Sequence, residues 1–242
     1  MLKMKPLRES LLDDDLIDKT DKIIKDEIKA FLKANYRGSI KISRGSNQNG
    51  KYEVSSIKDI IVKNRNITSL TNGMFIWTTV DGSFDCMNCN SLESLEGAPE
   101  KVDGNFYCSY CSSLKSLKGA PEKVGGDFSC YGCGSLESLK GAPKEAGEAF
   151  YCSGCKSLKT LKGAPQIIKG GFSCHTCNSL TSLEGAPKKV GGTFCCDMCI
   201  SLISLEGAPK EVGGRFYCNN CAGKFTIEDV KKVSNVKGEI KC

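Results

Sequence analysis

Apolar and polar positions repeat with a period of 22 residues over residues 84–222. Each unit places Phe, Cys, Cys, Leu, Leu, Ala and Val at fixed positions, with small or polar residues between them. Its clearest marker is a Cys-x-x-Cys pair, which recurs in unbroken steps of 22 at Cys86/Cys89, Cys108/Cys111, Cys130/Cys133, Cys152/Cys155, Cys174/Cys177, Cys196/Cys199 and Cys218/Cys221. Six of the seven pairs are followed by Ser-Leu-x-Ser/Thr-Leu-x-Gly-Ala-Pro. A fixed period of this length indicates a repeat solenoid.

The residues within one unit predict the shape of its coil. A unit of 22 residues cannot bury its own apolar face, whereas stacked copies cover one another. Phe106 and Cys108 lie two positions apart, which is the spacing of residues on one face of a strand. Gly-Ala-Pro is excluded from a helix interior, so the far side of the coil should be extended. We therefore expect a mainly β solenoid with one short strand per coil, pairing in parallel with its neighbours about 4.8 Å away.

Two segments without the repeat flank this array, and both are expected to cap it. Residues 1–57 are expected to form an N-terminal cap of one helix and one hairpin. The helix should span residues 12–35, with Asp13, Asp14 and Asp15 at its start and one apolar face made of Leu16, Ile17, Ile24, Ile28, Phe31 and Leu32. The hairpin should pair residues 39–43 with 51–56 across the turn RGSNQNG.

The solenoid itself is expected to span residues 58–222. It comprises a degenerate first coil without cysteines, around residues 60–70, and the seven Cys-x-x-Cys coils. Residues 223–242 should form a C-terminal cap with a short helix at 226–234. Solenoids need such caps because an uncapped end exposes apolar core and a strand edge.

The unit Phe-x-Cys-x-x-Cys-x-Ser-Leu-x-Ser-Leu resembles the leucine-rich repeat, L-x-x-L-x-L-x-x-(N/C)-x-x-L. Phe106 and Cys108 take the second and third apolar positions, and Cys111 takes the Asn-or-Cys position, followed by Leu114 and Leu117. The short Gly-Ala-Pro side and the helix and hairpin ahead of the array are similar to uncharacterised phage and bacterial leucine-rich-repeat proteins. The resemblance implies a solenoid, and if it holds, a phage-encoded protein acting on a host or phage protein. It implies no particular function, because one fold hosts many.

Composition narrows the class of protein without naming an activity. The chain has 242 residues, of which 40% are hydrophobic, and a net charge of +6. We expect no membrane span, since no run of about 18 apolar residues occurs. The start of the chain lacks the apolar run of a signal peptide, so a cytoplasmic location is the default, and there the sixteen cysteines would stay reduced.

The cysteine pairs have three interpretations. Free cysteine packs well in cores, and at the Asn-or-Cys position its thiol can donate to a backbone carbonyl. A zinc site would need four thiolates from two neighbouring coils, but seven pairs leave one unmatched, and only two pairs offer Gly for a tight turn. Redox chemistry would need one exposed thiol of low pKa. We favour packing and predict no metal or cofactor, while the metal-binding alternative stays open. Cys195 and Cys242 lie outside the pattern.

The outward positions of each coil predict a binding surface. They are the residue between Phe and Cys and the two residues inside each Cys-x-x-Cys. Five of the seven tyrosines and the only histidine fall at these positions: Tyr107, Tyr110, Tyr131, Tyr151, Tyr217 and His175. A surface rich in Tyr and poor in charge is typical of protein-binding sites. The alternative interpretation is that Tyr is simply favoured in strands.

Charged residues gather on the other surfaces. A lysine column (Lys115, Lys118, Lys140, Lys159 and Lys162) runs through the middle coils. It could contact nucleic-acid phosphates, but it lacks Arg and interleaved aromatics, so a solvated surface is the favoured reading. No nucleophile–base–acid arrangement and no phosphate-binding loop is present, and we predict no catalytic residues. The sequence thus predicts a non-catalytic module that binds a protein partner through its Tyr-lined sheet, which we expect to be concave.

Overall fold

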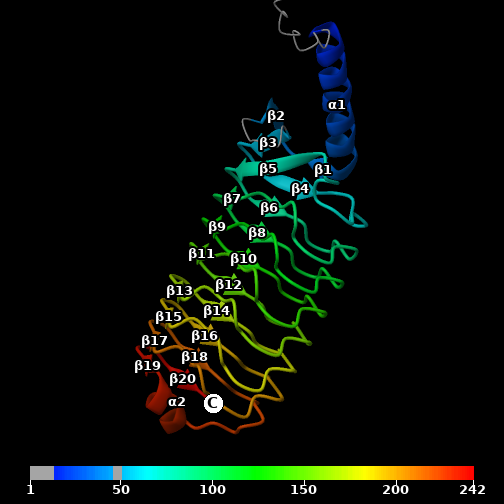
Figure 1. Cartoon of the computed structure of the whole chain (residues 1–242). Coiled ribbons are helices and arrows are strands. Elements are labelled where there is room, and N and C mark those ends of the chain that lie inside the picture. Colours follow the sequence, from blue (N-terminus) through cyan, green and yellow to red (C-terminus); the bar gives the residue numbers. More distant parts are fainter. Residues whose placement is uncertain (1–13, 46–50) are drawn as a thin grey trace, which may run out of the picture.

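The computed structural model describes residues 14–45 and 51–242. Asp13 and most of the predicted hairpin turn lie outside these ranges. The chain forms an elongated β-solenoid of about nine turns, with α1 at one end and α2 at the other (Figure 1). The predicted fold class is confirmed.

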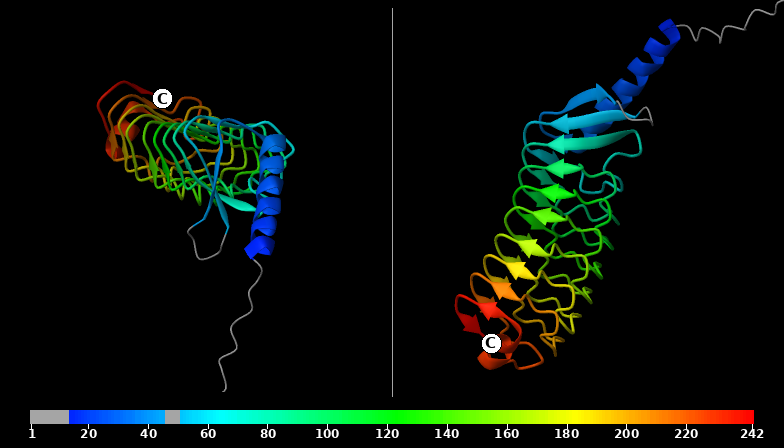
Figure 2. Two further views of the ribbon diagram at one scale, coloured as in Figure 1. Left: turned by 90° about the horizontal axis from the view of Figure 1, so that it is seen from above. Right: turned by 60° about the vertical axis from the view of Figure 1, so that its left-hand side comes forward.

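One column of strands runs the whole length of the array (Figure 2). It forms a ten-stranded sheet of β1 (Tyr36–Arg37), β4 (Ile60–Val62), β6 (Phe84–Asp85), β8 (Phe106–Tyr107), β10 (Phe128–Ser129), β12 (Phe150–Tyr151), β14 (Phe172–Ser173), β16 (Phe194–Cys195), β18 (Phe216–Tyr217) and β20 (Ile240–Lys241). Neighbouring coils pair in parallel with each Phe beside the next, as in Phe106↔Phe128. Only β1 pairs antiparallel, to β4. The strand predicted at Phe-x-Cys is therefore present in every coil.

A second column of short strands follows each Gly-Ala-Pro, and the repeat pattern does not predict it. It is divided into a six-stranded sheet of β11 (Glu145–Ala146), β9 (Lys123–Val124), β7 (Lys101–Val102), β5 (Phe75–Val80), β3 (Tyr52–Ser56) and β2 (Lys41–Arg44), and a four-stranded sheet of β13 (Ile167–Ile168), β15 (Lys189–Val190), β17 (Glu211–Val212) and β19 (Asn235–Val236). Each strand of a regular coil is two residues long and buries one side chain, such as Val102 or Val124. The predicted extended side thus carries a second strand ladder.

The core is a set of identical side chains stacked along the solenoid axis. Seven Phe rings, from Phe84 to Phe216, are fully buried. Successive ring centroids lie between 5.0 and 5.6 Å apart. Most pairs are nearly parallel, as in Phe106 and Phe128 with 4° between their planes. The centroid distance exceeds the strand spacing of about 4.8 Å, so the rings are offset as stacked aromatic rings prefer.

The N-terminal cap contains the predicted helix and hairpin. Helix α1 spans Asp14–Asn35, and it buries Ile28 and Leu32 while Phe31 packs edge-on against Phe75. Ile24, expected on the buried face, is 38% exposed. Helix α1 extends beyond the end of the solenoid (Figure 1), so the first coil is too narrow to cover that part of its apolar face. The side chains of Leu16 and Ile17 lie outside the described part.

The hairpin and the degenerate coil close the N-terminal end as predicted. Strands β2 and β3 pair antiparallel, and β3 continues the sheet by pairing in parallel with β5. In the degenerate coil, β4 pairs with β6 so that Ile60 takes the position of the Phe residues.

At the other end, α2 (Ile227–Val233) begins with a capping box between Thr226 and Asp229. After α2 the chain returns to the array, because β19 and β20 extend both strand columns. Ile240 pairs with Phe216, which puts Cys242 next to Cys218 at the first-cysteine position of a further, partial coil. The step from Cys218 to Cys242 is 24 residues rather than 22, so a search at the fixed period does not find it. Within the described residues, no helix is long and apolar enough to cross a bilayer.

The glycine of each Gly-Ala-Pro fixes how closely coils approach. These glycines have φ values between +84° and +103°, a region in which L side chains are strained. A Cβ on Gly141 would also lie 2.6 Å from the backbone nitrogen of Lys118 in the preceding coil. Both the backbone angle and the coil spacing therefore require Gly.

Replacing Gly141 with Ala should lower the free energy of unfolding by more than about 2 kcal/mol, because backbone strain and a clash with Lys118 add. Denaturant titration followed by circular dichroism measures the change. Gly134→Ala is the matched control, since it lies in the same coil with nothing within 4 Å of an added Cβ and no positive φ. Equal effects of the two substitutions would contradict the stated role of Gly141.

Candidate functional site

The cysteines of each pair have different partners inside the solenoid. The second cysteine donates its thiol to the carbonyl oxygen of the first cysteine in the preceding coil, as in Cys111 Sγ to Cys86 O at 3.2 Å. The same bond, at 3.1–3.2 Å, recurs from Cys133, Cys155, Cys177, Cys199 and Cys221. The result is a thiol ladder that satisfies one carbonyl per coil at the end of each strand. This arrangement agrees with the interpretation of the pairs as packing cysteines.

The turn between the two cysteines is tight in every coil. Its second residue has a left-handed backbone throughout, whether it is Gly132 and Gly154 or Asn88, Tyr110, Thr176, Met198 and Asn220. The scarcity of glycine is therefore no argument against a tight Cys-x-x-Cys turn. What favours packing over metal binding is the direction of the thiols, which point into the coil and donate to carbonyls.

Burial also keeps the interior thiols protonated. It raises the pKa of Cys86 and Cys152 well above its usual value. Contact with the second cysteine of the following coil, together with burial, likewise raises the pKa of Cys130 and Cys174. Metal ligation requires the thiolate. No group of three or more His, Cys, Asp or Glu side chains placed to hold a metal ion occurs within residues 14–45 and 51–242.

Five of the six predicted binding residues come together on the outer surface of the ten-stranded sheet. Tyr107 in β8 and Tyr151 in β12 point outward two coils apart, with the small Ser129 of β10 between them. Tyr110, Tyr131 and His175 lie beside them on the turns that follow the strands. Tyr110 is 48% exposed and Tyr151 is 38% exposed. We call Tyr107, Tyr110, Tyr131, Tyr151 and His175 the tyrosine face.

Three rings of the tyrosine face form a continuous aromatic cluster. Tyr110 meets Tyr131 edge-on with ring centroids 5.2 Å apart, and Tyr131 meets His175 in the same way at 6.1 Å. Tyr131 and His175 belong to coils that are not adjacent, because the coil with Ser153 and Gly154 lies between them.

Two glycines make room for these rings. A Cβ on Gly132 would lie 2.8 Å from the Tyr110 ring, and one on Gly154 would lie 3.8 Å from the Tyr131 ring. The aromatic residues and the glycines beneath them are thus matched across successive coils. The sequence signal is a Tyr one coil ahead of a Gly, or nearly so, which the single-coil pattern does not reveal.

Polar groups of the tyrosine face are neutral. Ser109 and Ser129 bond through their hydroxyls at 2.8 Å, as do Ser153 and Ser173. Desolvation, and then the nearby Asp127 carboxylate, raises the pKa of Tyr107 and of Tyr151, so both phenols stay protonated at neutral pH. The outward positions between Tyr107 and Thr176 carry no charged side chain. Charges begin on either side, with Asp85 facing Arg65 at 3.7 Å and with Asp197.

Tyr217, the sixth predicted residue, stands apart. It lies three coils beyond Tyr151 in β18, and its hydroxyl accepts from Arg215 at 3.1 Å. The Lys241 amine lies over its ring, 5.8 Å from the centroid. Its surroundings are therefore cationic, unlike those of the other five residues.

The lysine column proves to be a ladder of ion pairs between coils. Lys115 pairs with Glu93, Lys118 with Glu96, Lys159 with Glu137 and Lys162 with Glu184, at 2.7–2.9 Å. These pairs are exposed and contribute little stability, but they neutralise four of the five cations expected to face phosphates. The arrangement favours a solvated surface over nucleic-acid contact.

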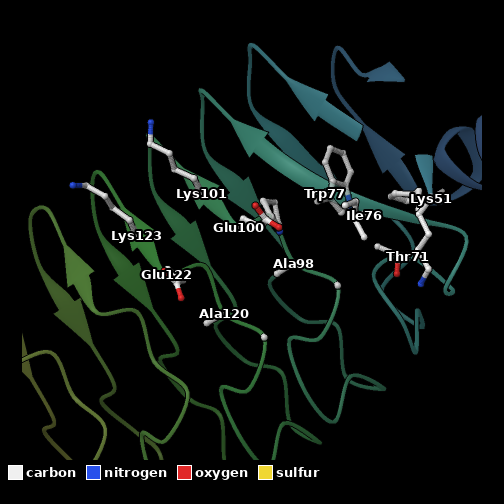
Figure 3. A pocket seen from close by; sticks show the side chains of 14 residues that line it. Lys51, Thr71, Ile76, Trp77, Ala98, Glu100, Lys101, Ala120, Glu122 and Lys123 are labelled. Atoms are coloured by element: carbon white, nitrogen blue, oxygen red, sulfur yellow. The ribbon is translucent and has the colours of Figure 1, made fainter. Parts of the chain in front are cut away.

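The largest hollow lies elsewhere, near the N-terminal cap. A groove of about 860 Å³ runs past Ile76, Ala98 and Ala120, with Thr71 and Trp77 at one end (Figure 3). Lys101 and Lys123 extend away from it in Figure 3 and are paired with Asp103 and Glu145. The groove therefore lacks a convergent set of polar groups, which small-molecule sites usually have.

Comparison of the chain with protein-family models, with curated proteins and with solved structures gave no match in any of the three. The tyrosine face must therefore be interpreted from its own chemistry.

The packing and metal interpretations of the cysteines predict different thiol counts. Under reducing conditions we expect no more than two thiols of the native protein to react readily, because fourteen of the sixteen cysteines are buried. All sixteen should react after denaturation, and elemental analysis should find little metal. One zinc or iron ion per two coils, with unfolding by chelators, would establish the metal interpretation instead.

Proposed function

We propose that this protein is a non-catalytic interaction module that binds a protein partner on the tyrosine face. The observation that carries the proposal is the aromatic cluster of Tyr110, Tyr131 and His175 beside Tyr107 and Tyr151. The surface is large, neutral and held by a rigid solenoid. Such a preformed surface loses little conformational entropy when it binds, and exposed Tyr is among the residues that contribute most at protein interfaces.

The position of Tyr110 argues against the alternative that Tyr is there only as a strand residue. That explanation suits Tyr107, Tyr151 and Tyr217, which lie in strands. Tyr110 and Tyr131 lie on turns, and Tyr110 has a φ of +59°. A bulky residue at positive φ is an outlier that needs a reason other than backbone preference. Partner binding supplies that reason.

The leucine-rich-repeat resemblance supports the same class of function. The thiol ladder gives the second cysteine the role that the resemblance implies, a donor at the turn after each strand. If the similarity to phage proteins also holds, the partner is a host or phage protein and the module acts in the cytoplasm of the host. Binding of metal by the cysteine columns is the second candidate function, and binding of nucleic acid by the lysine column is weaker because its lysines are paired.

The proposal is tested by the double substitution Tyr107→Ala with Tyr151→Ala. Removing two exposed anchors should weaken capture of a partner from host lysate by more than tenfold. Stability should change little, because both side chains point away from the core. Quantitative pull-down followed by mass spectrometry measures the first effect, and thermal denaturation measures the second.

The control is Lys115→Ala with Lys159→Ala, which alters the same two coils on another surface. It should retain capture. Capture that survives the tyrosine substitutions but is lost with the lysine substitutions, or that disappears with nuclease or added salt, would move the binding site to the lysine column.

A further inference from the structure

The partial coil at the C-terminal end places two thiols in direct contact. Strand β20 pairs in register with β18, and the backbone nitrogen of Cys218 donates to the carbonyl of Lys241 at 2.8 Å. Cys242 therefore follows as the neighbour of Cys218 on the adjacent strand. Their sulfur atoms lie 2.8 Å apart. Neighbouring parallel strands are about 4.8 Å apart, a separation within the Cα range that disulfides span.

The thiol of Cys218 differs from its equivalents in its partner. The first-cysteine thiols of three other coils, Cys108, Cys152 and Cys196, donate to a backbone carbonyl of the following coil at 3.3–3.4 Å. Cys218 donates to the sulfur of Cys242 instead. Oxidation of this pair would thus break no thiol-to-backbone bond of the kind that the interior coils make.

The pair is also reachable from solvent. Cys242 is exposed, whereas the cysteines of the interior coils are buried. Cys218 and Cys242 line an open hollow of about 480 Å³ together with Ile200, Asn220 and Phe225. A small oxidant can therefore approach Cys242, but it cannot reach buried neighbours such as Cys108 and Cys133. Exposure is what selects the thiols that undergo exchange.

We propose that Cys218 and Cys242 are a redox-sensitive site that closes to a disulfide in the presence of a low-molecular-weight disulfide of the glutathione class. The Cys242 thiolate attacks one sulfur of the small disulfide and releases the first small thiol. The Cys218 thiolate then attacks the Cys242 sulfur of this mixed disulfide and releases the second. The two protein thiols lose two electrons and two protons, and the small disulfide gains them as two thiols.

The bond would fasten the end of the solenoid. It would join β20 to β18 and enclose α2 in the closed loop. Closing a loop of this length restricts the unfolded segment, so local opening of α2 should become rarer by on the order of a hundredfold. The exposed edge of β20 would also be held in place. This site is independent of the tyrosine face.

The experiment exposes the full chain to reduced and oxidised glutathione, traps free thiols with N-ethylmaleimide and maps the products by mass spectrometry. The native protein should lose two free thiols, and cleavage after Glu239 should give the fragment 240–242 still linked to the fragment that holds Cys218. Amide hydrogen exchange in α2 should slow by on the order of a hundredfold. Cys195→Ser, which leaves the pair intact, should behave in the same way.

Cys218→Ser and Cys242→Ser should each abolish both the link and the slower exchange. Three results would overturn the proposal. They are a lasting glutathione adduct on Cys242 of the otherwise unchanged chain, a dimer linked through Cys242, and a bond that forms without slowing exchange in α2.

Discussion

The structure depends on the in-register stacking of each coil on the next. Every inward side chain of a regular coil meets its own counterpart about 4.8 Å along the axis, so a side chain that fits once must fit each time. The Phe rings meet this requirement as an offset stack with centroids 5.0–5.6 Å apart. The Val positions of the second strand column meet it with compact branched side chains.

The same constraint explains the high content of Cys and Gly. The strand ends at a sharp turn, where only a small inward residue fits and a backbone carbonyl would otherwise lack a donor. A thiol fills both needs, since it packs as a small apolar group and donates weakly to oxygen. The glycine of Gly-Ala-Pro lies where the preceding coil leaves no room for a Cβ. Sixteen cysteines in a reduced protein are thus explained by geometry without any shared chemistry among them.

Sequence periodicity was sufficient for the features that the stacking rule controls. The Phe-x-Cys strand, the degenerate first coil and both caps follow from the 22-residue pattern and its limits. The second strand column does not, because a two-residue strand with one inward Val carries no alternation to detect. The exposure of Ile24 depends on how far the first coil extends beneath α1. The position of Cys242 is hidden because α2 lengthens the last step by two residues.

The candidate site was predictable only in part, for a related reason. Outward positions are free of the stacking rule, so the sequence shows which residues face solvent but not which of them touch. Contact between Tyr131 and His175 depends on the small Ser153 and Gly154 between them. The left-handed turn where Tyr110 lies would be better served by Asn or Gly, which other coils have there. A bulky ring at positive φ has a cost of about 1–2 kcal/mol, and nothing in the stacking of the core offsets it. The compensating interaction must therefore lie on the outside, where the ring is half exposed and packed edge-on against a second tyrosine.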